Sequence, residues 1–337
     1  MLSRPRFYCN LPSCAMLNRT VASLLPLLLS WGLATAQTQA QTPAYDPTQP
    51  APLATPAAAT VPAAESNTSK SFIWEVRSAS NTVYLFGTIH VGKRSFYPLP
   101  DAVENALEKS ASLVVEADIT KTENEENLRP LIAFRPPLSL ESQVSAPLYQ
   151  RLQQQLLRLK LPADGLRELK PYIAGGFIAI AEFTRLGYDR NFGVDAYLIA
   201  AAQREKKPVL ELESQLGQLR MFDSMSAPLQ EAFLDNALTA IEAGKTPEQV
   251  TGMVNAWQSG DAKLMQEVTS DVNQGMRQSA EIEELLVYSR HPEMLKKIEG
   301  FLADQQPYFV AIGSLHLVGP RGLVELLRAK GYTVRQL

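Results

Sequence analysis

Two segments near opposite ends of the chain share one layout, in which an apolar run is followed by a glycine, two further residues and a histidine. The first segment is YLFGTIHVG at residues 84–92, and the second is FVAIGSLHLVG at residues 309–319. The chain contains only 3 histidines, and two of them, His90 and His316, occupy this position. A shared layout around so rare a residue type indicates a shared role in the fold.

Each motif follows an expected strand and precedes an expected helix and a further strand. Gly87 and Gly313 allow the backbone to turn sharply at the strand end and to approach a ligand closely. A right-handed β-α-β crossover makes the two strands that it joins parallel, and we expect them to be neighbours. Ligands of open α/β sheets bind beyond the carboxyl ends of the strands. We therefore expect His90 and His316 to meet at one edge of the sheet, with Glu116 beside them at the end of another strand.

The remaining pattern predicts an α/β (α+β) fold with a central mixed sheet, surrounding helices and a helical insertion in the middle of the chain. A strand hairpin begins the pattern at 72–87, and a strand, a helix and a strand end it at 308–337. The apolar run at 172–183 is too short to cross a bilayer and is expected to be a buried helix. Further helices are expected at 99–110, 146–160, 164–187, 193–206, 226–243, 246–258, 261–275 and 279–304, and further strands at 112–118 and 207–213.

The N-terminal part of the chain has the composition of a targeting segment followed by a tether. Residues 1–36 combine arginines, an apolar stretch and a small-residue cleavage site, which is typical of a signal peptide. Residues 37–69 are rich in Ala, Pro, Thr and Gln, which predicts a disordered linker. We therefore expect one domain at 70–337, in a periplasmic or secreted protein without stable membrane insertion after cleavage. Both cysteines, Cys9 and Cys14, belong to the removed segment.

Charge and motif content narrow the classes of function. The formal net charge is −3, and no basic patch that would bind nucleic acid is evident. The sequence lacks a G-x-S-x-G elbow, a phosphate-binding Walker loop, an H-E-x-x-H helix and a dinucleotide fingerprint. Two histidines and Glu116 in a cysteine-free domain suit a divalent metal, which could activate water for hydrolysis with a carboxylate as general base. The alternative is that both histidines are hydrogen-bonded side chains near the edge of a core.

Four further residues are candidates for the site. Arg290 could bind a carboxylate or stabilise an oxyanion, or it could be an exposed charge near a helix start. His291 could be a third metal ligand. Asp195 is most simply a residue of a helix start, with a site role as the alternative. Glu213 ends the short strand at 207–213 and faces the site only if that strand alternates regularly.

The order and spacing of the motifs YLFGTIHVG, LVVEAD, GVDAYL, KPVLELES, AWQSGD and VAIGSLHLVG resemble the TraB/GumN family, which includes PrgY-like proteins and the Tiki metalloproteases. The resemblance covers about 72–337 and implies a fold of the Tiki, ChaN and erythromycin-esterase type. It implies that His90 and His316 bind metal and that Glu116 and Arg290 are catalytic. His291 stands where the family commonly has asparagine.

The resulting hypothesis is an exported metal-dependent hydrolase, peptidase-like, that acts on a peptide or small-molecule substrate. Manganese, cobalt and zinc all suit a His/Glu site. The alternative is a non-catalytic periplasmic protein that binds a peptide or a haem-like ligand in the same place.

Overall fold

A six-stranded mixed sheet holds the two histidine motifs. The computed structural model describes residues 70–337, so the signal peptide predicted at 1–36 and the linker predicted at 37–69 lie outside the described residues. The strands follow the order β4-β3-β5-β2-β1-β6 across the sheet. Their bounds are β1 (Ile73–Arg77), β2 (Thr82–Thr88), β3 (Ser112–Val115), β4 (Val209–Glu211), β5 (Tyr308–Gly313) and β6 (Thr333–Gln336). This arrangement confirms the predicted fold class.

The sheet order corrects one expectation from the sequence. β2 and β3 are not neighbours, because β5 lies between them and pairs in parallel with both. β6 is likewise separated from β5 and pairs antiparallel with β1. The burial of each strand explains these places. β5 is buried along almost its whole length and suits the centre of a sheet, whereas β6 is partly exposed and suits an edge.

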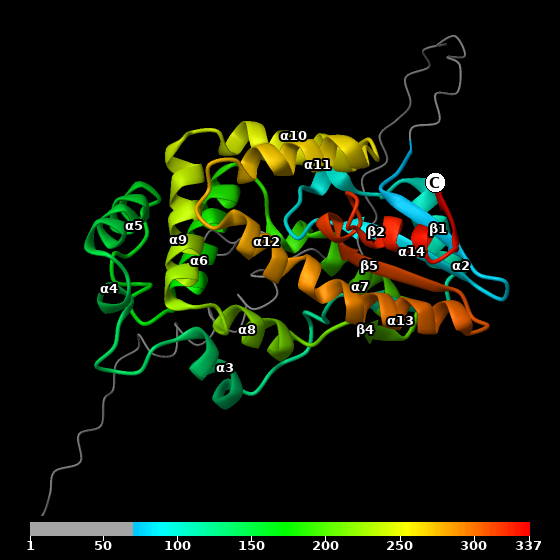
Figure 1. Ribbon diagram of the computed structural model, residues 1–337, viewed down its shortest axis with the longest axis horizontal. Helices are drawn as coiled ribbons and strands as arrows, with labels where there is room; N and C mark the ends of the chain where they lie inside the picture. Colours follow the sequence, from blue (N-terminus) through cyan, green and yellow to red (C-terminus); the bar gives the residue numbers. More distant parts are fainter. Residues whose placement is uncertain (1–69) are drawn as a thin grey trace, which may run out of the picture.

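Helices surround the sheet and build a second body beside it, as Figure 1 shows. α7 packs on β3 and β4, and α13 packs on β2. The helical insertion has its own hydrophobic core, in which α6 packs against α9. The bounds are α2 (Asp101–Lys109), α3 (Glu125–Ile132), α4 (Leu140–Gln143), α5 (Ala146–Arg158), α6 (Pro171–Arg185), α7 (Val194–Arg204), α8 (Gln215–Asp223), α9 (Ala227–Glu242), α10 (Thr246–Gln258), α11 (Ala262–Asn273), α12 (Ser279–Leu286), α13 (His291–Ala303) and α14 (Leu323–Ala329).

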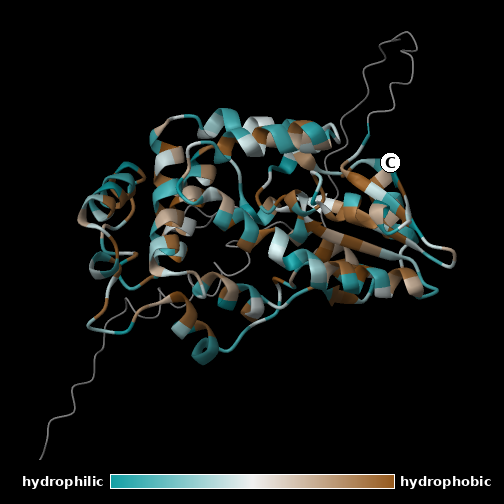
Figure 2. Ribbon diagram, in the orientation of Figure 1, coloured by the Kyte–Doolittle hydropathy of each residue, from teal (hydrophilic) through white to brown (hydrophobic). Residues whose placement is uncertain are grey.

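Hydrophobic residues gather in the strands and on the inner faces of the helices, as Figure 2 shows. α6 is the buried helix that the apolar run predicted, and it is 15 residues long. No helix within residues 70–337 combines the length and the hydrophobicity needed to span a bilayer.

Two helices differ by more than two residues from the predicted ranges. α6 begins at Pro171 and not at residue 164, since proline is favoured in the first turn of a helix and disfavours helical conformation in the residue before it. The helix expected at 279–304 is broken by the short 3-10 turn η4 (Tyr288–Arg290), after which α13 starts with Pro292 in its first turn. The break places Arg290 beside Glu116, which follows the end of β3.

Candidate active site

Three strand ends bring the predicted residues together. His90 follows β2, Glu116 follows β3, and His316 lies in the 3-10 turn η5 (Ser314–His316) after β5. β2 and β5 are paired so that Thr88 stands opposite Gly313. A Cβ atom placed on Gly313 would lie 3.3 Å from Oε2 of Glu116 and 3.8 Å from Nε2 of His90. The same position is 3.6 Å from Cδ2 of His316, so the three side chains surround the space above Gly313.

The hydrogen bonds of His316 fix which of its nitrogens has a lone pair. The carbonyl of Arg321 can only accept, so Nδ1 of His291 donates to it at 2.9 Å. Nε2 of His291 must then accept, and Nδ1 of His316 donates to it at 3.0 Å. This leaves Nε2 of His316 as an acceptor, which receives a hydrogen bond from Nη1 of Arg290 at 3.0 Å. The chain of bonds therefore presents the Nε2 lone pair of His316 to the site.

Both of these imidazoles favour the neutral form. Burial, followed by the positive charge of Arg290, holds the pKa of His316 well below its ordinary value. Burial also lowers the pKa of His291 to about 4. With both of its ring nitrogens engaged, His291 positions His316, and this geometry does not offer it as a third ligand.

His90 is oriented by Asp195, in the first turn of α7. Nδ1 of His90 lies against Oδ2 of Asp195, while Oγ1 of Thr88 donates to Oδ1 of Asp195 at 2.8 Å. Nε2 of His90 is buried and has no hydrogen-bond partner within residues 70–337. Burial opposes protonation, but the Asp195 carboxylate outweighs it and raises the pKa of His90. Asp195 is thus both a residue of the helix start and the partner of His90.

Glu116 is an ionised carboxylate with several partners. Its Oε1 pairs with Arg290 and accepts from Nε2 of Gln218 at 2.8 Å, and its Oε2 accepts from the Gly313 amide at 3.2 Å. Burial alone would raise the pKa of Glu116, but the charge and the hydrogen bond of Arg290 outweigh it, and the pKa falls to about 2. Its Oε2 lies 3.8 Å from Nε2 of His316.

Arg290 is the cation of this cluster. Its side chain is 4% exposed and also bonds to Glu213, whose side chain is 20% exposed. Burial would lower the pKa of Arg290, but Glu116 and Glu213 outweigh it and raise the pKa. Arg290 is therefore a buried site residue and not an exposed charge. Glu213 reaches the site two residues after β4, whereas Glu211 pairs with Lys121 elsewhere.

A model of one protein family matches residues 72–336, described as the TraB/PrgY/gumN family. The chain belongs to this family. YbaP of Escherichia coli K12 is 25% identical to it over 246 residues, which is 73% of the chain and 87% of YbaP. A metalloprotease TIKI homolog of Amphimedon queenslandica is 25% identical over 324 residues, covering 80% of the chain, and Metalloprotease TIKI1 of Danio rerio is 24% identical over 310 residues, covering 78%.

The match spans only 62% of the length of each of the two metalloproteases. No solved structure gives a significant match to this chain. The family membership therefore rests on the sequence, and the arrangement of the site rests on the geometry described above.

The donor set of this family member fits a divalent metal in its chemistry. The unpartnered Nε2 of His90, the Nε2 lone pair of His316 and Oε2 of Glu116 face the same space, and each imidazole is held through its other nitrogen. Within residues 70–337, no three His, Cys, Asp or Glu side chains are spaced closely enough to bind a metal. Arg290 bonds to both Glu116 and His316, so the guanidinium must withdraw for these donors to close around a metal.

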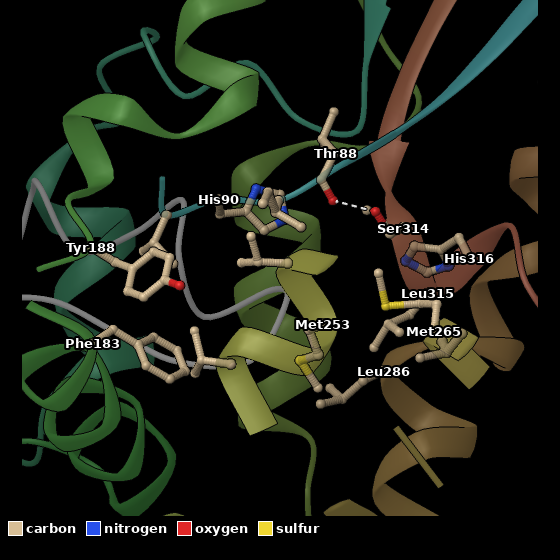
Figure 3. Close-up of a pocket in the computed structure, with 16 residues that line it drawn as sticks. Thr88, His90, Phe183, Tyr188, Met253, Met265, Leu286, Ser314, Leu315 and His316 are labelled. Carbon is tan, nitrogen blue, oxygen red and sulfur yellow. Dashed lines mark hydrogen bonds between the residues drawn. The ribbon is translucent and has the colours of Figure 1, made fainter. Parts of the chain in front are cut away.

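Three further residues of this cluster, Gln218, Thr88 and Ser314, were not predicted from the sequence. Gln218 bridges Glu116 and Glu213 from α8, a helix that the sequence pattern did not predict. Ser314 donates to the Thr88 carbonyl at 2.8 Å and ties the two motifs together (Figure 3). Thr88 and Ser314 lie directly after the motif glycines. A hydroxyl side chain at the same position of both motifs could therefore have indicated this contact from the sequence.

Proposed function

We propose that this protein is a metal-dependent hydrolase that cleaves peptides. The observation that carries the proposal is the buried, unpartnered Nε2 of His90, which faces Oε2 of Glu116 across Gly313 at the edge of an apolar pocket. A buried polar atom without a partner is costly, and a ligand for it is the simplest compensation. The names of two relatives, both metalloproteases, support the same chemistry.

His90, His316 and Glu116 would hold the metal, and Asp195 and His291 would orient the two imidazoles. A bound divalent cation supplies Lewis acidity and a water of lowered pKa. Glu116, with a pKa of about 2, is a poor base at neutral pH and suits the role of anionic ligand. We assign the role of proton-transferring group to Glu213, since its partly exposed side chain can exchange protons with solvent.

Once the guanidinium of Arg290 withdraws from Glu116 and His316, it would bind the substrate carbonyl oxygen. The guanidinium is always charged and can stabilise the negative charge that develops on that oxygen. A haem-like ligand is not favoured, because the pocket beside the histidines has a volume of about 120 Å³ and sites for whole small molecules are typically about 300–1,000 Å³.

The test combines metal analysis with peptide cleavage. Purified protein loaded with Mn²⁺, Co²⁺ or Zn²⁺ is expected to bind about one metal per chain and to cleave members of a peptide library. His90→Ala and His316→Ala are expected to lose metal, and Glu213→Gln is expected to keep metal and to lose at least about 100-fold in kcat. Glu116→Gln is expected to lower metal affinity.

Glu182→Gln is the matched control, because Glu182 is a buried carboxylate held by two arginines in the helical insertion. It should bind metal and cleave peptides as the wild type does. Wild-type protein that takes up no metal under these conditions would overturn the proposal. Stoichiometric metal without cleavage of any peptide would instead support a binding protein.

We also propose that the protein is exported, on the basis of the signal-like residues 1–36. Mass spectrometry of the mature protein from a bacterial periplasm or culture medium should find an N-terminus near Gln37. An intact Met1 on the mature protein would contradict export by cleavage.

A further inference from the structure

The apolar pocket lies where the sheet meets the helical insertion. Its volume is about 120 Å³, and one of its walls is formed by His90 and His316 at the strand ends. The facing walls come from α6, α10, α11 and α12. Figure 3 shows the labelled side chains on these walls, Phe183, Met253, Met265 and Leu286. The pocket thus adjoins the donors that the proposed function uses.

The chemistry of the lining excludes a charged occupant. Among the described residues, no Asp, Glu, Lys or Arg lines the pocket. Three hydroxyl groups line it, those of Thr88, Tyr188 and Ser314. Two of them are engaged, since Ser314 donates to the Thr88 carbonyl and Thr88 donates to Asp195, each at 2.8 Å. The lining is therefore apolar on the insertion side, and it carries the free Nε2 of His90 on the sheet side.

The size of the pocket suits one large side chain. A dry protein cavity of about 150 Å³ lined by Leu, Ile and Phe holds a molecule as large as benzene. Methionine side chains are flexible and adapt to the shape of an apolar partner. Met253 and Val254 are only partly buried, so this wall can be reached from outside.

We propose that this pocket is the specificity pocket for a peptide substrate and takes a leucine- or methionine-sized apolar side chain next to the bond that is cleaved. The inference rests on the proposed function, because it takes the reacting carbonyl to lie at the imidazole wall. The apolar side chain then extends away from the sheet, between Met253 and Leu286.

The first test measures cleavage of peptides that differ at one position, with Leu, Met, Ala, Asp or Lys there. Leu and Met are expected to exceed Ala by about 10- to 100-fold in kcat/KM, with Asp and Lys lower still. Val254→Phe narrows the pocket and is expected to reverse the order of Leu and Ala. Leu138→Phe, at an exposed position remote from the pocket, is the matched control and should keep the wild-type order.

The second test does not need hydrolysis. Protein labelled with ¹³C at the methionine methyl groups is titrated with N-acetyl-leucine methylamide, and Met253→Leu and Met265→Leu assign the two pocket signals. These signals are expected to shift and to saturate, while those of Met225 and Met294, which are buried away from the pocket, stay in place. N-acetyl-lysine methylamide should leave all of them unchanged.

The two tests separate the inference from the function. Methyl shifts without cleavage of any peptide would contradict the hydrolase and support the pocket. Cleavage with equal rates for Leu, Ala and Lys peptides would support the hydrolase and overturn the pocket. An absence of shifts at Met253 and Met265 at millimolar probe would also overturn the pocket.

Discussion

Arg290 supplies the positive charge at the centre of the candidate site. It contacts Glu116, Glu213 and His316 from a position that is almost fully buried. Without it, two carboxylates would face each other in a space from which water is largely excluded, and such an arrangement is strongly unfavourable. The guanidinium therefore allows Glu116 and Glu213 to lie close together inside the folded protein.

This role predicts a metal-dependent stability for Arg290→Gln. In the presence of a chelator, the variant is expected to lose about 3–5 kcal/mol of unfolding free energy, because Glu116 is left buried without its cation. Added Zn²⁺ or Mn²⁺ should restore most of the loss, since the metal supplies the missing positive charge. Thermal melts with chelator and with metal measure both effects.

The control for that experiment is Arg151→Gln, which removes an arginine paired with Asp235 and Glu242 in the helical insertion. Its melting temperature should not respond to metal beyond the response of the wild type. A variant at Arg290 that stays equally unstable with and without metal would contradict the assigned role.

The sequence predicted those candidate site residues that are both chemically distinctive and placed at the end of an expected strand. His90, His316 and Glu116 were found because rare or charged residues stood at the ends of apolar runs. The partners that orient them were harder to find. Gln218 is an ordinary polar residue on an unpredicted helix, and its contact with Glu116 joins positions 102 residues apart. No local pattern marks such a contact.

At the level of elements, the two motif glycines serve different purposes. Neither has a positive φ angle, so neither is required by the backbone conformation, and the sharp turn expected at each of them is not the reason for glycine. A Cβ atom on Gly87 would lie 2.4 Å from Cδ1 of Phe72, inside the core. A Cβ atom on Gly313 would meet no atom closer than 3.3 Å and would enter the space between the candidate ligands.

These surroundings predict opposite outcomes for two similar substitutions. Gly87→Ala is expected to lower the unfolding free energy by about 1–3 kcal/mol, because the added methyl group overpacks the core against Phe72. Gly313→Ala is expected to change it by less than about 1 kcal/mol and to reduce metal uptake by at least about tenfold. Denaturant unfolding and metal titration of both variants measure the contrast. A strongly destabilised Gly313→Ala with intact metal uptake would refute it.

The elements themselves were more predictable than their arrangement. The alternation of apolar residues located β2, β5 and most helices, because the period of a strand or helix is a local property. The order of strands in the sheet is set by which edges remain free when the whole chain has folded. The sequence pattern therefore indicated that β2 and β3 are parallel, but not that β5 separates them.

At the scale of the whole molecule, buried ion pairs make the helical insertion sensitive to acid. Glu182 accepts from Arg158 at 2.6 Å and from Arg185 at 2.7 Å, and Asp235 pairs with Arg151 and Arg277. Burial would raise the pKa of both carboxyl groups, but the arginines outweigh it and lower both values.

A lowered pKa in the folded state means that the unfolded chain takes up protons first as the pH falls. The stabilising contribution of Glu182 is thus complete above its ordinary pKa of 4.5 and is lost at lower pH. We expect the melting temperature of the wild type to fall steeply between about pH 5 and pH 3. Glu182→Gln should be less stable by about 2 kcal/mol at pH 7 and should lose less on acidification.

Melting curves from pH 7 to pH 3 test this expectation, with Glu141→Gln, at an exposed position, as the control. The control should follow the wild-type curve. If Glu182→Gln shows the same steepness as the wild type, the carboxylate is not a source of the acid sensitivity.

The central place of β5 determines when the candidate site can form. β5 is the second-last strand to be synthesised, yet it fills the gap between β2 and β3. The hydrogen bond from Ser314 to the Thr88 carbonyl, which links the two motifs, joins positions 226 residues apart. Pairing between such distant segments forms late in folding. A ribosome must therefore release almost the entire polypeptide before His90 and Glu116 can meet His316, so a nascent or truncated chain lacks this cluster.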